Sequence, residues 1–156
     1  MKKTFFFLIF IILVTGVFSQ SAAQLDKILE FDYDLPELAG LNQAEFESLI
    51  GKFFIIYGSV LETSVTDPDE QNFQASVLIM RGVWEEIDVI EMYKAELTFS
   101  GPQFAGLIPA RPPRSVTPEM IVSNVNLTVL CQLTGLKTED GKTVPVFAVH
   151  KIRYEN

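Results

Sequence analysis

The chain has 156 residues, and its 20 Asp and Glu residues outnumber its 12 Lys and Arg residues, which gives a formal net charge of −8. Nucleic acids and anionic lipids are bound through Lys and Arg, so this acidic balance argues against both as partners. Cys131 is the only cysteine, which leaves no intramolecular disulfide and no cysteine cluster of the kind that zinc requires.

Residues 1–23 are typical of a cleaved export signal. Two lysines follow the initial methionine, an apolar run covers residues 5–14, and the small residues Ser21 and Ala23 precede a cleavage site after Ala23. The apolar run has about half of the ~20 residues that a membrane-spanning helix needs. We therefore expect cleavage, no integral membrane segment after processing, and a periplasmic or secreted location.

The first segment of the processed chain, residues 24–41, is acidic and has no sustained hydrophobic period, so it is predicted to be a partly ordered arm. A short helix over 43–50 is predicted next, because Asn42 as N-cap and Glu45 form a capping box and a glycine follows the helix. This helix is expected to bury three apolar side chains: Phe46, Leu49 and Ile50.

From residue 52 onward, branched and aromatic residues occur in runs separated by Gly, Pro, Asn and Asp, which predicts β-strands. The third strand alternates apolar and polar residues, as a half-buried antiparallel strand does. Residues 42–156 are therefore predicted to be a single, mainly β domain. Its five strands are expected over residues 53–62, 73–81, 89–99, 126–135 and 144–153.

The last two strands are predicted to form a hairpin, because Asp140-Gly141 favours a two-residue type I′ turn. If Glu139 lies opposite Lys142, the residue numbers of every opposed pair have the same sum. Apolar residues of the two strands then lie opposite one another, as a buried face requires. The predicted pairs are Val129 with Ile152, Cys131 with His150, Leu133 with Ala148, and Gly135 with Val146.

Residues 101–125, between the third and fourth strands, contain five of the eight prolines. Thr117 followed by Pro118 predicts a short helical turn over 118–122. In the same segment Arg111-Pro112-Pro113-Arg114 is expected to be extended, because proline restricts its conformation. The two arginines are expected either to contact an external partner or to pair with acids of the protein itself.

The pattern resembles an OB-fold, a five-stranded Greek-key barrel with a connecting helix between its third and fourth strands. The resemblance covers residues 52–154 and rests on residues 56–60, where Gly58 lets the first strand bend, and on residues 129–135, which lead into the hairpin. It implies a binding face formed by the outer face of strands two and three and by the loops after strands one and four. The residues expected on that face are Gln74, Ser76, Leu78, Met80, Met92, Lys94, Glu96 and Thr98.

Binding residues are predicted on this face and in the proline-rich segment. Leu78, Met80 and Met92 would be exposed apolar neighbours, which mark interfaces more often than catalytic sites. Arg111 and Arg114 complete the predicted set. The single tryptophan, Trp84, is interpreted as a lid on the core rather than as a binding platform.

No catalytic residue, metal site or cofactor is predicted. Cys131 opposite His150 could pair a thiolate with a base, but a buried cysteine on a core face is usually inert. The acidic stretches 67–70 and 85–88 lack the glycine of a calcium-binding loop and are interpreted as solvated turns.

The sequence therefore predicts an exported, non-enzymatic binding or adaptor module of OB-like form that engages a protein or a cell-envelope component. Two alternatives remain open. One is a small hydrolase or transferase that uses Cys131 and His150, and the other is a carrier with a small ligand inside the barrel.

Overall fold

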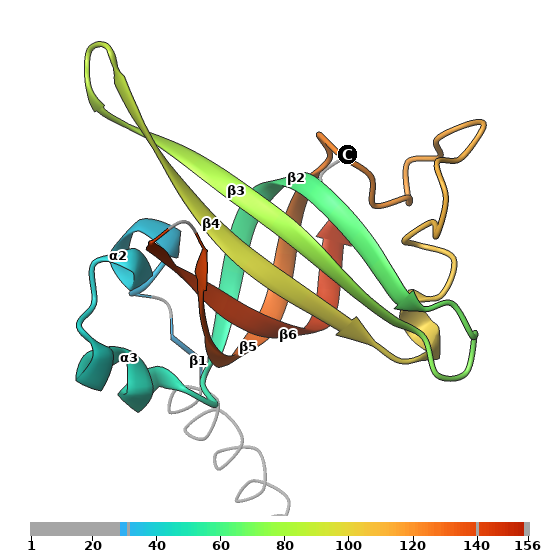
Figure 1. The fold of residues 1–156 in the computed structure, drawn as a ribbon, viewed down its shortest axis with the longest axis horizontal. Helices are drawn as coiled ribbons and strands as arrows, with labels where there is room; N and C mark the ends of the chain where they lie inside the picture. The colour runs from blue at the N-terminus through green and yellow to red at the C-terminus, as the bar shows by residue number, and fades with distance from the viewer. Residues whose placement is uncertain (1–28, 31, 140, 155–156) are drawn as a thin grey trace, which may run out of the picture. The chain divides into compact units, whose positions relative to one another are not determined.

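The structure, a computed structural model, describes residues 29–30, 32–139 and 141–154 (Figure 1). The predicted signal peptide, residues 1–23, lies outside the described residues. The chain divides into two units, Met1–Glu30 and Phe31–Asn156. Of the first unit only the two-residue strand β1 (Leu29–Glu30) is described, and the second unit carries the remaining elements.

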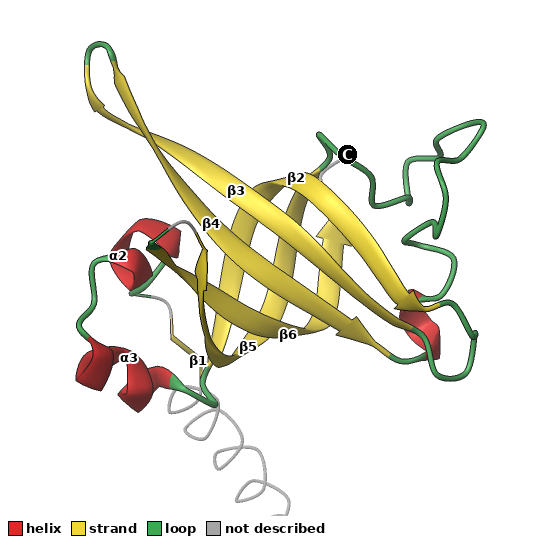
Figure 2. Ribbon diagram, viewed as in Figure 1, coloured by secondary structure: helices red, strands yellow, loops and turns green. Residues whose placement is uncertain are grey.

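The second unit is mainly β, as predicted (Figure 2). All five predicted strands form, each longer than expected, and β1 is a sixth strand that the sequence did not predict. Among the described residues no helix has the length and apolar character needed to cross a membrane. The elements are α2 (Leu35–Ala39), α3 (Gln43–Leu49), β2 (Phe53–Asp67), β3 (Gln74–Glu86), β4 (Val89–Ser100), the 3₁₀ helix η1 (Pro102–Phe104), β5 (Asn126–Glu139) and β6 (Lys142–Tyr154).

The five long strands form a closed ring of pairings. β2 pairs with β3, β3 with β4, β6 with β5, and β5 with β2, all antiparallel. β4 and β6 close the ring through a short parallel pairing of Glu96–Thr98 with Val146–Ala148. The inward side chains fill the ring with aliphatic and aromatic groups, and Phe54, Phe99 and Phe147 are each at most 1% exposed.

β2 contributes to two parts of the ring, because residues 53–59 pair with β5 and residues 59–67 pair with β3. Gly58 lies at the change of partner, as expected for a bend in the first strand. A Cβ atom at this position would lie 3.0 Å from the Met80 carbonyl oxygen and 3.1 Å from Cδ1 of Ile79. The close approach of β3 therefore leaves little room for a side chain at residue 58.

We expect Gly58→Ala to lower the free energy of unfolding by about 1–3 kcal/mol, because the new methyl group must displace backbone atoms of β3. Gly135→Ala on β5 is the matched control, since a Cβ atom there would have no atom within 4 Å. It should change stability by less than about 1 kcal/mol. Urea unfolding of both variants measures the difference, and equal losses would contradict the packing at Gly58.

The predicted N-terminal helix is confirmed as α3. The side chain of Asn42 accepts a hydrogen bond from the Glu45 amide at 3.0 Å, and Glu45 accepts one from the Asn42 amide at 3.1 Å. Phe46 and Leu49 are buried as predicted. Ile50 is 47% exposed, so its predicted burial is wrong: it caps the helix in an extended conformation and turns away from the core.

The acidic segment before α3 contains a helix that hydrophobic periodicity did not predict. In α2, Leu35 and Leu38 are both about 1% exposed. Arg81 of β3 forms an ion pair with Asp34, the N-cap of this helix. A five-residue helix is too short to show a recognisable hydrophobic period, which is why the sequence did not predict it. Burial of its two leucines holds it against the sheet.

The helical turn predicted over 118–122 is wrong. That region forms a turn in which the Met120 amide donates to the Thr117 carbonyl oxygen at 3.1 Å, and the helical residues between β4 and β5 are instead those of η1. The loop is held by the core, because Phe104, Ile108 and Ile121 are buried. Their burial explains how a long proline-rich segment remains ordered.

The predicted register of β5 and β6 is correct at both ends of the pairing and wrong between them. Glu139 lies opposite Lys142, Gly135 opposite Val146, and Val129 opposite Ile152. Two irregularities, between Leu133 and Gly135 and between Leu130 and Cys131, shift the intervening residues by one position. Consequently Cys131 lies opposite Val149 rather than His150, and Leu133 lies opposite Phe147 rather than Ala148.

Candidate functional site

The outer face of β3 and β4 follows from the alternation of the two strands. Ala75, Val77 and Ile79 of β3 point into the core, as do Ala95, Leu97 and Phe99 of β4. The alternate residues are therefore directed outward, and none of the eight predicted for this face is buried. The register places Leu78 opposite Glu96, Met80 opposite Lys94, and Gly82 opposite Met92.

The predicted apolar residues Leu78, Met80 and Met92 are thus neighbours on one surface. Leu78 and Met80 are half-buried, and Met92 is 40% exposed. Met92 lies opposite Gly82, two residues along β3 from Met80. Because glycine has no side chain, no side chain of β3 lies between Met80 and Met92. The structure therefore brings these three predicted binding residues together.

The end of the β5–β6 hairpin lies against the middle of this outer face. Lys137 forms an ion pair with Glu96, and Nζ of Lys94 lies 4.0 Å from Oε2 of Glu139. Glu139 Oε2 is buried and has no hydrogen-bond partner among the described residues. A small groove of about 190 Å³ beside Leu78 and Glu96 is lined mostly by polar groups.

A larger groove of about 620 Å³ opens on the other side of the hairpin. Met92 and Lys94 of β4 form one wall, Lys142 and Val144 of β6 form another, and Pro36 of α2 contributes to the lining. The ion pair between Arg81 and Asp34 ties the start of α2 to β3. Desolvation raises the pKa of Asp34, and a hydrogen bond with Asp34 lowers the pKa of Glu37.

Sequence reasoning missed the apolar end of the β3–β4 hairpin. The prediction that Trp84 is a core lid is wrong, because 66% of its surface is exposed. Ile87 is 94% exposed, and Val89 and Ile90 are each 47% exposed. The signal was present in the sequence, since the alternation of β4 continues into Ile90 after the acidic turn.

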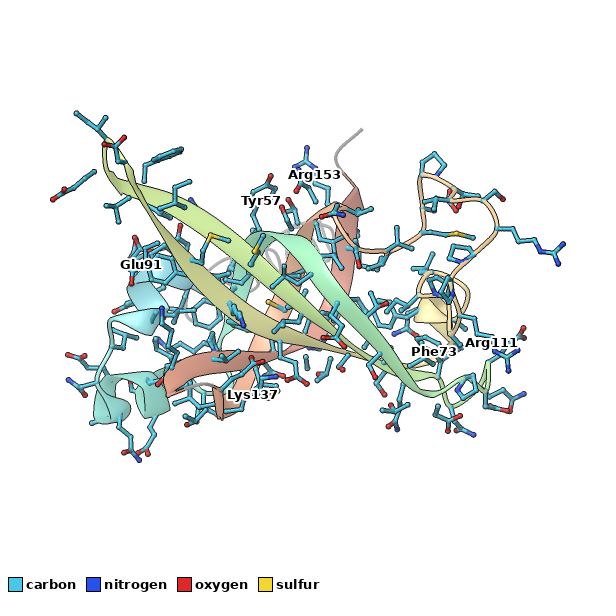
Figure 3. All side chains as sticks on the ribbon, turned by 45° about the horizontal axis from the view of Figure 1, so that its top comes forward. Tyr57, Phe73, Glu91, Arg111, Lys137 and Arg153 are labelled. Atoms are coloured by element: carbon cyan, nitrogen blue, oxygen red, sulfur yellow. The ribbon has the colours of Figure 1, made fainter. Side chains whose placement is uncertain are left out.

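Arg111 and Arg114 are exposed, as predicted, and neither forms an ion pair with any described residue. They lie in the loop after β4, whereas Met92 lies eight residues before the end of that strand. At about 3.4 Å per residue this separation is about 27 Å. Figure 3 labels Arg111 and Glu91 at opposite ends of the paired strands, so the arginines and the methionines do not form one site.

Cys131 and His150 are not assembled into a nucleophile and base. Cys131 is fully buried, its Sγ donates to the Phe54 carbonyl oxygen at 3.7 Å, and burial raises its thiol pKa far above the usual value. His150 is exposed on the outside of β6, where its ring centroid lies 5.0 Å from that of Phe53. The two side chains therefore face opposite sides of the sheet.

The acidic turn between β2 and β3 uses its carboxylates to organise its own backbone. Oδ1 of Asp67 accepts the Asp69 amide at 3.0 Å, and Oδ1 of Asp69 accepts the Gln71 amide at 2.9 Å and the Asn72 amide at 3.0 Å. Within the described ranges, no group of three or more His, Cys, Asp and Glu side chains is placed to hold a metal ion.

No protein-family model matches this sequence, and no curated protein matches it significantly.

Proposed function

We propose that the protein is an exported, non-enzymatic binding or adaptor module of OB-like fold that engages a protein or a cell-envelope component through the outer face of β3 and β4. Export rests on the composition of residues 1–23. A periplasmic or secreted location follows from it. The loop carrying Arg111 and Arg114 would form a separate contact at the other end of the same strands.

The order of the strands around the ring supports the OB-like assignment. Counting from β2, the first strand pairs with the second, the second with the third, the third with the fifth, the fifth with the fourth, and the fourth with the first. This order and the long connection between β4 and β5 are those of a Greek-key OB barrel. In such barrels the face of the second and third strands is the usual binding surface.

The observation that carries the proposal is the cluster of three apolar side chains on that outer face. Leu78, Met80 and Met92 lie together on it with partial exposure, and contiguous exposed apolar residues mark interaction surfaces. The two alternatives have less support. The buried rings of Phe54 and Phe147 fill the interior that a small-ligand carrier would need, and Cys131 lacks a facing base.

Capture of partners from an envelope extract tests the proposal. We expect Met80→Glu to reduce the recovery of specific partners about tenfold, because it places a charge in the apolar contact. Ile55→Glu is the control, since Ile55 is likewise an apolar strand residue on the outside of the sheet, 48% exposed, but lies on β2 opposite Leu130. Identical partner sets for the wild type and both variants would contradict a role for the outer face.

A further inference from the structure

The paired strands β3 and β4 extend beyond the ring. β3 pairs with β2 only as far as Met80, and β4 pairs with β6 only from Glu96 onward. Their own pairing continues to Glu86 and Val89. Residues 81–93 therefore pair only with one another and form a two-stranded extension, the distal ribbon, whose end stands clear of the other strands in Figures 1 and 2.

One face of the distal ribbon carries a continuous apolar stripe. Trp84 lies opposite Ile90, and Gly82 lies opposite Met92. A Cβ atom at Gly82 would lie 3.1 Å from Cγ2 of Ile90 and 3.2 Å from Sδ of Met92. Since Ile90 and Met92 both lean over Gly82, no polar side chain separates Trp84 and Ile90 from the methionines of the outer face.

The charges at the end of the ribbon are acidic and uncompensated. Glu86 and Asp88 are exposed, and neither forms an ion pair among the described residues. The basic residues of this part of β3 and β4 are engaged, because Arg81 pairs with Asp34 and Lys94 lies near Glu139. Complementarity therefore favours a basic partner. It disfavours anionic lipid and a second copy docked end to end.

The ribbon also offers a free strand edge. From Gly82 to Glu86, β3 has β4 on one side and no strand of the described chain on the other. An unpaired edge presents backbone N–H and C=O groups that an extended chain can pair with. Strand addition of this kind takes its affinity from the main chain and its specificity from alternate side chains.

We infer that the distal ribbon docks an extended basic segment of a partner protein, which adds as a strand along the 82–86 edge of β3. Apolar side chains of that segment would cover Trp84 and Ile90, and its Lys or Arg side chains would meet Glu86 and Asp88. This inference rests on the proposed binding function and specifies the partner as a basic segment that can pair as a β-strand.

Trp84 makes the inference directly measurable, because it is the only tryptophan in the chain. The probe is a synthetic peptide of alternating lysine and valine, added to the intact protein. We expect the emission of Trp84 to shift to shorter wavelength and its quenching by acrylamide to fall about twofold as the peptide covers the ring. A glutamate and valine peptide tests charge, and a lysine and proline peptide, which cannot pair as a strand, tests strand addition.

Two charge variants provide the matched comparison. Glu86→Lys combined with Asp88→Lys should raise the Kd of the lysine and valine peptide at least tenfold. Glu70→Lys combined with Glu119→Lys makes the same change in net charge at exposed loop positions, and it should leave the Kd within about twofold. Equal weakening by both variants would show unspecific charge attraction and overturn the inference.

Other ligands of the distal ribbon would give distinct results, and each of these results would overturn the inference. Equal binding of the glutamate peptide excludes the charge argument, and equal binding of the proline peptide excludes strand addition. A Trp84 shift that depends on protein concentration without peptide indicates a second copy, and a shift with phosphatidylcholine vesicles indicates a membrane surface. If Met80→Glu still reduces partner capture while the peptide experiment fails, the proposed function stands and only the inferred chemistry of the partner is wrong.

Discussion

We expect Phe54→Ala to lower the free energy of unfolding by about 3–5 kcal/mol. Phe54 has no exposed surface, and its ring meets that of Phe147 edge to face with centroids 5.7 Å apart. Removing it leaves a cavity at the centre of the ring of strands. Because domains of this size are stable by only about 5–15 kcal/mol, circular dichroism in urea should show a greatly lowered midpoint.

Phe53→Ala is the control for this variant, because Phe53 is the preceding residue and points to the other side of β2. Its ring is partly exposed and contacts that of His150. We expect a loss below about 1.5 kcal/mol. Equal losses for the two variants would show that the inward and outward faces of β2 are assigned incorrectly.

A double-mutant cycle extends the measurement. Phe147→Ala should also be strongly destabilising, and the double variant should lose less than the two single losses combined, because the first cavity already removes the ring contact. The coupling should be about 0.5–1.5 kcal/mol, the value of an aromatic pair in edge-to-face contact.

The features predicted correctly from the sequence are those fixed by neighbouring residues. Asn42 and Glu45 are three residues apart, so their reciprocal hydrogen bonds could be inferred without knowledge of the fold. Alternation in β4 placed Met92 and Lys94 on the face opposite to Ala95 and Leu97, because strand side chains alternate whatever the partner strand is. The turn at Asp140-Gly141 was likewise a local signal, and Gly141 has the expected positive φ of 77°.

The errors concern features that depend on distant parts of the chain. The irregularities in β5 near Cys131 occur where that strand must also pair with β2, and no residue near Cys131 indicates them. Trp84 was interpreted as a core residue because aromatic residues are usually buried. Its exposure follows from the length of the hairpin beyond the ring, which is set by where β2 and β6 stop pairing.

The prediction of the binding residues was limited in the same way, because the sequence does not show how far apart those residues lie in space. Met92 was predicted to bind on the outer face of the second and third strands, and Arg111 in the proline-rich loop, without any indication of how far apart the two residues lie. The structure separates them by most of the length of β4, since Met92 lies near the start of that strand and Arg111 lies in the loop after it. The acidic residues Glu86 and Asp88 had been considered only as a calcium loop or a solvated turn, because their position beside an exposed apolar stripe is a property of the pairing between β3 and β4.

Cys131 should react with a chromogenic thiol reagent at least about a thousandfold more slowly in the native protein than in the unfolded protein. The thiol is fully buried, and modification requires an opening that costs most of the folding free energy. Stopped-flow absorbance with and without urea measures both rates. Complete modification of the native protein within seconds would instead support a reactive nucleophile and revive the hydrolase or transferase alternative.

Burial of Cys131 also predicts how stability depends on pH. Burial raises the pKa of the thiol in the folded protein, whereas the unfolded thiol ionises near pH ~8.5. Above that pH the unfolded state binds fewer protons than the folded state, so stability decreases as pH rises, by up to about 1.4 kcal/mol per pH unit from this group. Cys131→Ala removes this contribution and should show a shallower decline between about pH 8 and 10. Parallel declines in the two proteins would mean that Cys131 ionises in the folded state, which its buried position between Phe54 and Val149 does not permit.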